Sequence, residues 1–167
     1  MESDKKKTDG TQDHSQEIDE PVSMYILFAR MFSIIARRVE ERLGDEGREL
    51  MAQSVQEFGE GRGKDIARRA RQRGNENDLQ NYLVNYDMER SGLFGYENTY
   101  GKEEVRQEFD RCIFAETWMK EGQERYGRIY CENIDPSIAR GYNERLECVH
   151  DKMMYDDHKC TFCFKMR

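Results

Sequence analysis

Apolar residues are densest between positions 22 and 36, where they occupy most of the segment. Pro21 suits the first turn of a helix, and the charged residues of 37–42 continue the pattern with one polar side. We therefore predict a helix over residues 22–43 that stops at Gly44. Because apolar side chains surround most of this helix, we expect it to be buried in the core or covered by a second subunit.

Weaker helical patterns follow along the middle of the chain. A second helix is predicted from Asp45 to Phe58, and the glycines that follow it indicate either a helix break or a close helix contact. Further helices are predicted over residues 78–88 and 114–125. A short helix is expected after Asp135, which would be its N-cap, with Pro136 in the first helical position.

The remaining segments predict β-structure. The glycine-rich and aromatic-rich segment 91–101 is expected to be a loop, and alternation predicts a strand over 104–111. A C-terminal hairpin is predicted from strands 145–155 and 158–166, joined at Asp156-Asp157, with Val149 opposite Phe164. Cys160 would then face the core and His150 the polar side. Helices followed by this hairpin indicate an α+β fold, with N-terminal helices packed on a small antiparallel sheet.

Composition and charge limit the possible partners. The chain has 167 residues and a net charge of −7, and residues 1–20 are almost entirely charged or polar. We expect a disordered acidic tail over 1–20 and a single α+β hydrolase-like domain over 21–167. The acidic balance argues against binding to nucleic acid, and no apolar run is long enough to cross a membrane. With no secretory signal at the N-terminus, a cytoplasmic protein is expected.

Five cysteines are present, and their spacing gives no clear metal motif. Cys160 and Cys163 lie three residues apart on a predicted strand, so their side chains point to opposite faces and do not form a joint site. The predicted hairpin places Cys148, His150 and Cys163 on one face, which would be either a metal or redox group or simply a polar face that meets solvent or a helix. The cofactor stays open between none and a divalent metal.

Three motifs together resemble one family. They are C-x-F-A-E-x-W at 112–118, Y-C-x-x-I-D-x-S-I-A-x-G-Y-N at 130–143, and a terminal C-x-F-x-F that starts at Cys160. In this order they resemble the L-2-amino-thiazoline-4-carboxylic acid hydrolases, and the segment 61–70 is also similar. The resemblance implies a hydrolase that opens a cyclic amidine-type ring carrying a carboxylate, by hydrolysis of a C–N or C–S bond.

The resemblance also implies a set of site residues. Cys131 would be a nucleophile or a metal ligand, and Asp135 would orient a water molecule or hold the protonated amidine. The matched polar positions also include Cys112, Asn143, Asp157 and Cys160. We expect Cys112, Cys131, Asp135 and Cys160 to line one pocket, and a nucleophilic Cys131 to have a lowered pKa.

The expected partners are a small-molecule substrate with a carboxylate and, through the apolar first helix, a second copy of the chain. No nucleic acid and no membrane are expected. The alternative function is a non-catalytic module of the same fold that binds a small ligand or a metal as a sensor.

Overall fold

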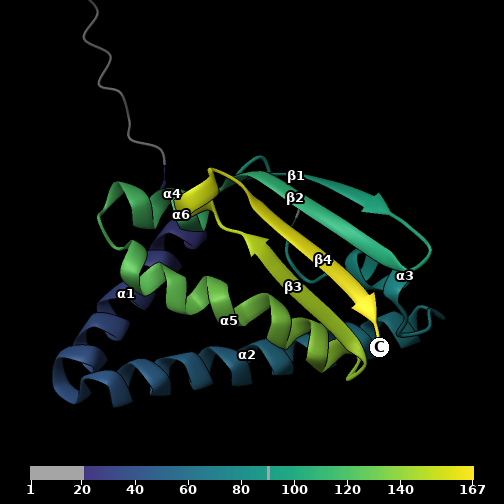
Figure 1. The fold of residues 1–167 in the computed structure, drawn as a ribbon, viewed down its shortest axis with the longest axis horizontal. Coiled ribbons are helices and arrows are strands. Elements are labelled where there is room, and N and C mark those ends of the chain that lie inside the picture. Colours follow the sequence, from purple (N-terminus) through teal and green to yellow (C-terminus); the bar gives the residue numbers. More distant parts are fainter. Residues whose placement is uncertain (1–20, 90) are drawn as a thin grey trace, which may run out of the picture.

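The structure is a computed structural model that describes residues 21–89 and 91–167, so the expected tail over 1–20 lies outside the described residues. Four antiparallel strands form one sheet in the order β1-β2-β4-β3. The strands are β1 (Phe94–Tyr100), β2 (Glu104–Cys112), β3 (Leu146–Lys152) and β4 (Cys160–Met166). The long helices lie on one face of this sheet, and α5 (Glu124–Tyr142) lies between the sheet and α2 (Asp45–Gln72) (Figure 1). The predicted α+β class is confirmed.

The first helix, α1 (Met24–Leu43), begins within two residues of its predicted start. The Ser23 side chain accepts a hydrogen bond from the Tyr25 N–H at 3.2 Å, and Gly44, with a φ of 62°, ends the helix. Phe32 and the small residues on its side of α1 are buried. Within this one chain an apolar stripe of α1 stays exposed, and the expected cover by a second subunit stays a prediction; the stripe consists of Met24, Leu27, Met31, Ile34 and Ile35.

The glycines after Phe58 do not break the second helix. Helix α2 runs without interruption through them, and Gly59 and Gly63 are buried against α5. A Cβ atom at Gly63 would lie 2.5 Å from the Tyr142 nitrogen, closer than real Cβ atoms come. The predicted break is wrong, and the close helix contact is the correct alternative.

The later helices differ from their predicted bounds. The expected helix over 78–88 is shorter and consists of α3 (Leu79–Tyr82) followed by the 3-10 turn η1 (Leu83–Asn85). The expected helix over 114–125 is α4 (Ile113–Lys120), which ends before Gly122, a glycine with a φ of 65°.

Helix α5 contains the segment for which a new helix was predicted. Asp135 is therefore not an N-cap, and Pro136 lies inside the helix. The proline removes one backbone hydrogen bond. The buried side chains of Ile134 and Ile138 on either side of it pack into the core, and this packing keeps the helix continuous.

Residues 91–101, predicted as a loop, contain strand β1 instead. Its alternate residues from Phe94 to Tyr100 face the interior side of the sheet, and Tyr96 lies directly opposite Phe109 of β2. The strand predicted over 104–111 is confirmed as β2, which extends one residue further.

The C-terminal hairpin forms, but its register differs from the prediction by one residue. A short helix, α6 (Met154–Asp157), joins β3 to β4 in place of the predicted two-residue turn. Val149 therefore lies opposite Cys163, and His150 lies opposite Phe162. Because a one-residue shift moves side chains to the other face, Cys148 and His150 face the helices. The predicted group of Cys148, His150 and Cys163 on one face is wrong.

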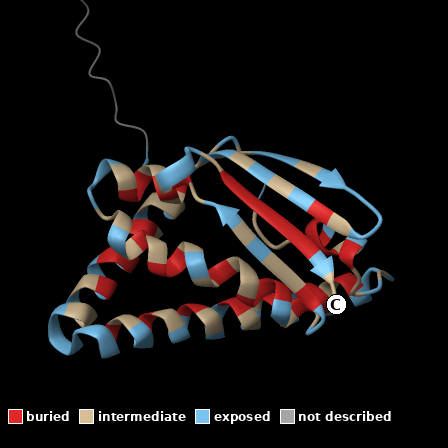
Figure 2. Ribbon diagram, viewed as in Figure 1, coloured by how far each residue is buried: buried red, intermediate tan, exposed pale blue. Residues whose placement is uncertain are grey.

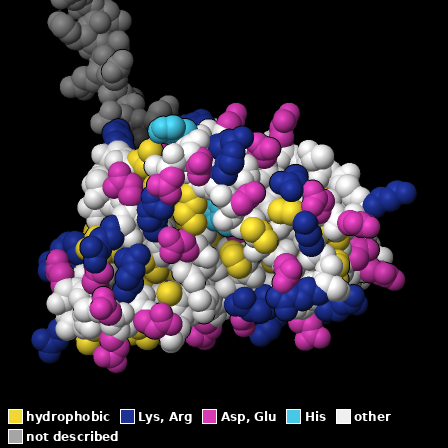
Figure 3. Space-filling model, viewed as in Figure 1, with side chains coloured by type: hydrophobic (Ala, Val, Ile, Leu, Met, Phe, Trp, Pro, Cys, Tyr) yellow, Lys and Arg dark blue, Asp and Glu magenta, His cyan; other side chains and the backbone are white. Residues whose placement is uncertain are grey.

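Strand β4 is buried along most of its length, whereas β1 and β3 form the edges of the sheet (Figure 2). Acidic and basic side chains are interspersed over the face of the molecule seen in Figure 3. Among the described residues, no helix is both long and apolar enough to cross a membrane.

Candidate functional site

A pocket of about 230 Å³ lies between η1, α5 and the interior face of the sheet. Its walls are mainly aromatic and aliphatic, with three thiols and a few polar groups. The lining residues are Arg62, Leu83, Val84, Tyr86, Met88, Glu89, Phe94, Tyr96, Asn98, Tyr100, Gln107, Phe109, Cys112, Phe114, Tyr130, Cys131, Ile134, Asp135, His150, Cys160 and Phe162.

The structure brings four of the six sequence-predicted site residues together in this pocket. Cys131 and Asp135 lie one turn apart on α5, Cys112 ends β2, and Cys160 begins β4. The expectation that these four residues line one pocket is confirmed, whereas their chemical roles stay predictions.

The other two residues lie outside the pocket lining. Asn143 follows α5, and its side-chain amide donates to the Asn77 carbonyl at 2.6 Å. Asp157 belongs to α6 and accepts a hydrogen bond from the Met153 N–H at 3.2 Å. Both side chains hold local backbone in place, so the structure does not place them where a ligand in the pocket would react.

Cys131 is surrounded by groups that disfavour its thiolate. Burial raises the pKa of the Cys131 thiol well above its usual value, and the neighbouring Cys112 raises it further. The Tyr155 hydroxyl lies 3.5 Å from Cys131 Sγ and lowers this pKa only in part. This rise favours the neutral Cys131 thiol, and its direction is opposite to the lowered pKa expected for a nucleophilic Cys131.

The other two thiols in the pocket are also kept neutral. Burial raises the pKa of Cys112 to about 12 and that of Cys160 to about 11. For Cys160, a hydrogen bond from the Met154 N–H at 3.3 Å opposes part of this rise. Within the described part of the chain, no group of three or more His, Cys, Asp or Glu side chains is arranged to hold a metal ion.

Asp135 is the carboxylate of the pocket. Its Oδ1 atom accepts a hydrogen bond from the Tyr86 hydroxyl at 3.1 Å, and the described residues form no ion pair with it. Burial raises the pKa of the Asp135 carboxyl, and the nearby His150 ring, the Arg62 guanidinium and the Tyr86 hydroxyl oppose this rise only in part. A carboxylate in this position lacks a bonded cation.

Arg62 is the only lysine or arginine among the described residues that line the pocket. Its Nε and Nη2 atoms donate to the two oxygens of Asp87 at 2.9 and 2.6 Å, and its guanidinium lies over the Tyr86 ring at 5.5 Å. Asp87 therefore uses two of the five N–H groups of Arg62. Sequence reasoning missed Arg62, and its position follows only from the close contact of α2 with α5.

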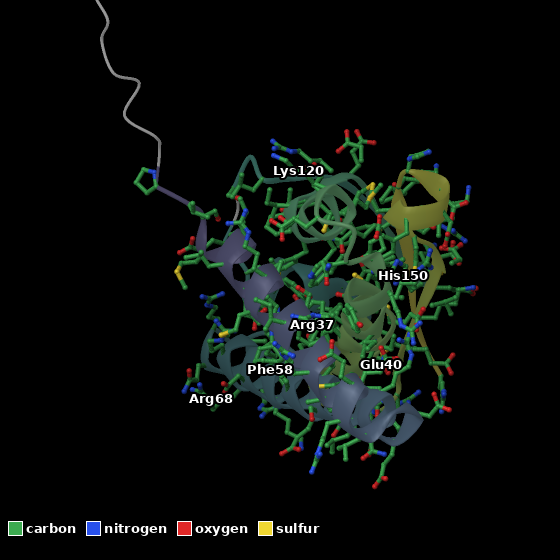
Figure 4. All side chains as sticks on the ribbon, turned by 90° about the vertical axis from the view of Figure 1, so that its left-hand side faces the viewer. Arg37, Glu40, Phe58, Arg68, Lys120 and His150 are labelled. Atoms are coloured by element: carbon green, nitrogen blue, oxygen red, sulfur yellow. The ribbon has the colours of Figure 1, made fainter. Side chains whose placement is uncertain are left out.

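His150 was also missed, because the predicted register placed it on the other face. His150 belongs to β3, and its side chain lies against α5 (Figure 4), where its Nδ1 atom is 3.2 Å from the Cys131 carbonyl oxygen. Since a carbonyl only accepts, Nδ1 donates to it, so Nε2 is the ring nitrogen left for another partner. This Nε2 atom is buried with no hydrogen-bond partner among the described residues.

The profile of the L-2-amino-thiazoline-4-carboxylic acid hydrolase family matches residues 24–164. The chain belongs to this family. The match runs from the first residue of α1 into β4, so it includes every element that lines the pocket. The family name indicates a hydrolase that acts on an aminothiazoline carboxylate. No curated protein sequence matches the chain.

The fold of this family member is also found in a trafficking protein particle complex. Subunit 3 of this complex from Naegleria fowleri, in a crystal structure covalently bound to palmitic acid, has a TM-score of 0.54 and 14% sequence identity to the chain. The similarity covers 86% of this chain and 95% of the Naegleria chain. At this identity the similarity concerns the fold alone.

Proposed function

We propose that this protein hydrolyses a cyclic amidine that carries a carboxylate, and that the ring opens at a C–N or C–S bond. The observation that carries this proposal is Asp135, a carboxylate that lines the pocket without a bonded cation. A protonated amidine would supply both N–H donors and the missing positive charge. Carboxylate–amidinium hydrogen bonds are charge-assisted and therefore strong.

The substrate carboxylate would bind at the other polar group of the pocket, Arg62. Three N–H groups of its guanidinium remain after the bidentate pair with Asp87. The Arg62–Asp87 pair holds the guanidinium in one orientation, which favours binding of a planar carboxylate. Asp135 and Arg62 together would thus bind the two charged ends of a small zwitterion.

Asp135 would also move the proton that hydrolysis requires. A water molecule attacks the amidine carbon, and Asp135 accepts the proton that the water loses. When the ring bond breaks, its electron pair goes to the departing sulfur or nitrogen, and the Asp135 carboxyl donates the proton to that atom. The raised pKa of Asp135 suits both steps, because a general acid–base group works best with a pKa near the working pH.

Cys131 offers an alternative nucleophile to water. Its thiol lies in the same pocket, but its raised pKa disfavours the thiolate that would attack the amidine. We therefore favour direct attack by water, with the Cys131 thiol lining the pocket but not reacting. The two routes differ in the effect of removing the thiol.

The test is incubation of the purified protein with 2-amino-thiazoline-4-carboxylate. Cleavage of the C–S bond releases a thiol, and cleavage of the ring C–N bond releases an amine, so thiol and amine reagents identify the bond. Asp135→Asn should lower the rate at least about a hundredfold. Asp157→Asn is the matched control, since Asp157 lies outside the pocket, and should keep the parental rate.

Cys131→Ala separates the two nucleophiles, because it should stay active if water attacks and should be inactive if the thiol attacks. Absence of ring opening in the parent protein, or full activity of Asp135→Asn, would refute the proposed function.

A non-catalytic ligand-binding module of the same fold is the second candidate. The observation that favours it is the covalently bound palmitic acid in the Naegleria protein of similar fold. This candidate predicts that a ligand binds in the pocket and is recovered unchanged. Product analysis after incubation with the thiazoline distinguishes it from the hydrolase.

A further inference from the structure

The rim of the pocket exposes three large apolar side chains to solvent. Val84 of η1 is 55% exposed, and Tyr96 and Tyr100 of β1 are 40% and 46% exposed. All three line the pocket. Exposed apolar residues grouped around an opening are typical of a binding site rather than of a solvated surface.

A row of aromatic rings leads from this rim along the floor of the pocket. Tyr96 contacts Phe109 with ring centroids 5.3 Å apart, Phe109 contacts Phe162 at 5.9 Å, and Phe162 stacks on His150 at 4.2 Å. These four side chains come from β1, β2, β4 and β3 in turn, so the row crosses the whole sheet in the strand order of Figure 1. Such a row presents ring faces and edges on which a further planar or apolar group can pack.

Two of the polar side chains beside this row are paired with each other. The Gln107 side-chain amide donates to the Asn98 Oδ1 atom at 2.9 Å. Arg62 and Asp135 are the groups that our proposed function assigns to the two charged ends of the substrate. A free amino-thiazoline carboxylate therefore leaves the aromatic row and the rim without a counterpart.

We propose that the natural ligand is a cyclic amidine carboxylate with an additional aromatic or other apolar substituent, which packs between η1 and β1 at the rim. This inference rests on the proposed function for the orientation of the ring and deepens it by naming the substrate class. The substituent would remove Val84, Tyr96 and Tyr100 from water, which the small zwitterion alone does not do.

The experiment compares two probes by calorimetry, 2-amino-thiazoline-4-carboxylate and its 5-phenyl derivative. Both keep the ring, the amidine and the carboxylate. The phenyl derivative should bind the parent protein at least about tenfold more tightly, through burial of the ring against the aromatic row. Equal or weaker binding of the phenyl derivative would overturn the inference.

Two variants locate the effect. Tyr96→Ser should bring the ratio of the two dissociation constants toward one, because it removes the aromatic side chain at the rim. Val149→Ser is the matched control, since Val149 is 53% exposed and does not line the pocket, and it should leave the ratio unchanged. If Tyr96→Ser leaves the ratio of the two dissociation constants unchanged, the phenyl group does not bind at the rim and the inference is refuted.

Product analysis of both probes keeps the two proposals separate. If neither probe is hydrolysed and the phenyl derivative still binds more tightly, the proposed function fails and the ligand class stands. If 2-amino-thiazoline-4-carboxylate is hydrolysed and its 5-phenyl derivative binds no more tightly, the inferred ligand class is refuted and the proposed function stands.

Discussion

Replacing Gly63 with alanine tests whether the close contact of α2 and α5 sets the position of the site. A Cβ atom at Gly63 would meet backbone of α5, with the Tyr142 nitrogen at 2.5 Å and the Gly141 carbonyl carbon at 2.7 Å. Ordinary contacts at a Cβ atom are about 1 Å longer, so the two helices must move apart by roughly that distance. Backbone atoms inside a helix cannot yield singly, which places the strain at the upper end of the usual range for overpacking, about 3 kcal/mol.

The helix propensity of alanine offsets part of this strain. Alanine is more favourable than glycine inside a helix by about 1 kcal/mol, which leaves a net loss of about 2 kcal/mol in the free energy of unfolding. For a chain of this size, we expect the melting temperature of Gly63→Ala to fall by about 4–8 °C. Differential scanning calorimetry or thermal circular dichroism measures this shift.

Gly61 provides a matched control two residues away on the same helix. A Cβ atom there would have nothing within 4 Å, so Gly61→Ala gains the helix propensity without strain. We expect its melting temperature to rise by about 2–4 °C. Because α5 carries Cys131 and Asp135, Gly63→Ala should also lower the ring-opening rate, whereas Gly61→Ala should not. Shifts of the same sign and size in both variants would show that α2 and α5 are not in close contact at Gly63.

Three further predictions concern charge, thiol reactivity and assembly. Burial gives Asp135 a higher pKa in the folded than in the unfolded state, so the folded state loses stability as pH rises from the unfolded pKa through the folded pKa. Asp135→Asn should therefore melt no lower than the parent at pH 7. The ring-opening rate of the parent should rise with pH as the Asp135 carboxyl loses its proton. Iodoacetamide should alkylate Cys131 slowly at pH 7, and peptide mapping that finds Cys131 labelled first would contradict its raised pKa. We propose that a second copy covers the exposed stripe of α1, so Ile34→Asp should elute as a smaller species, whereas Leu50→Asp on α2 should elute like the parent.

The elements with strong periodicity could be predicted from the sequence, whereas the bounds of elements that depend on tertiary contacts could not. Helix α1 and strand β2 were placed to within two residues, because their apolar patterns are long and regular. The glycines of α2 were ambiguous, since a glycine that lets two helices approach closely has the same local signature as one that ends a helix. Pro136 misled for the same reason, because the packing of α5 on both sides of it outweighs one lost hydrogen bond.

The candidate site was predicted in part. Cys112, Cys131, Asp135 and Cys160 were found through the family motifs, and the structure places them in one pocket. His150 was missed because a four-residue helix between β3 and β4 shifted the register by one residue, which reverses the side-chain faces of β3. No local pattern distinguishes the predicted two-residue turn from such a helix.

Two polar side chains in the pocket reduce the stability of the fold. Asp135 has no bonded cation, and the His150 Nε2 atom is buried without a partner among the described residues. An unsatisfied buried polar atom such as His150 Nε2 costs about 1–3 kcal/mol, a large share of the stability of a single domain, whereas Asp135 keeps its hydrogen bond from Tyr86 but lacks a cation. Packing alone would favour apolar residues at both positions, so their presence beside an aromatic floor is best explained by a ligand. Such a ligand would bring a cation to Asp135 and apolar surface to the rim, and a cyclic amidine with an apolar substituent has both.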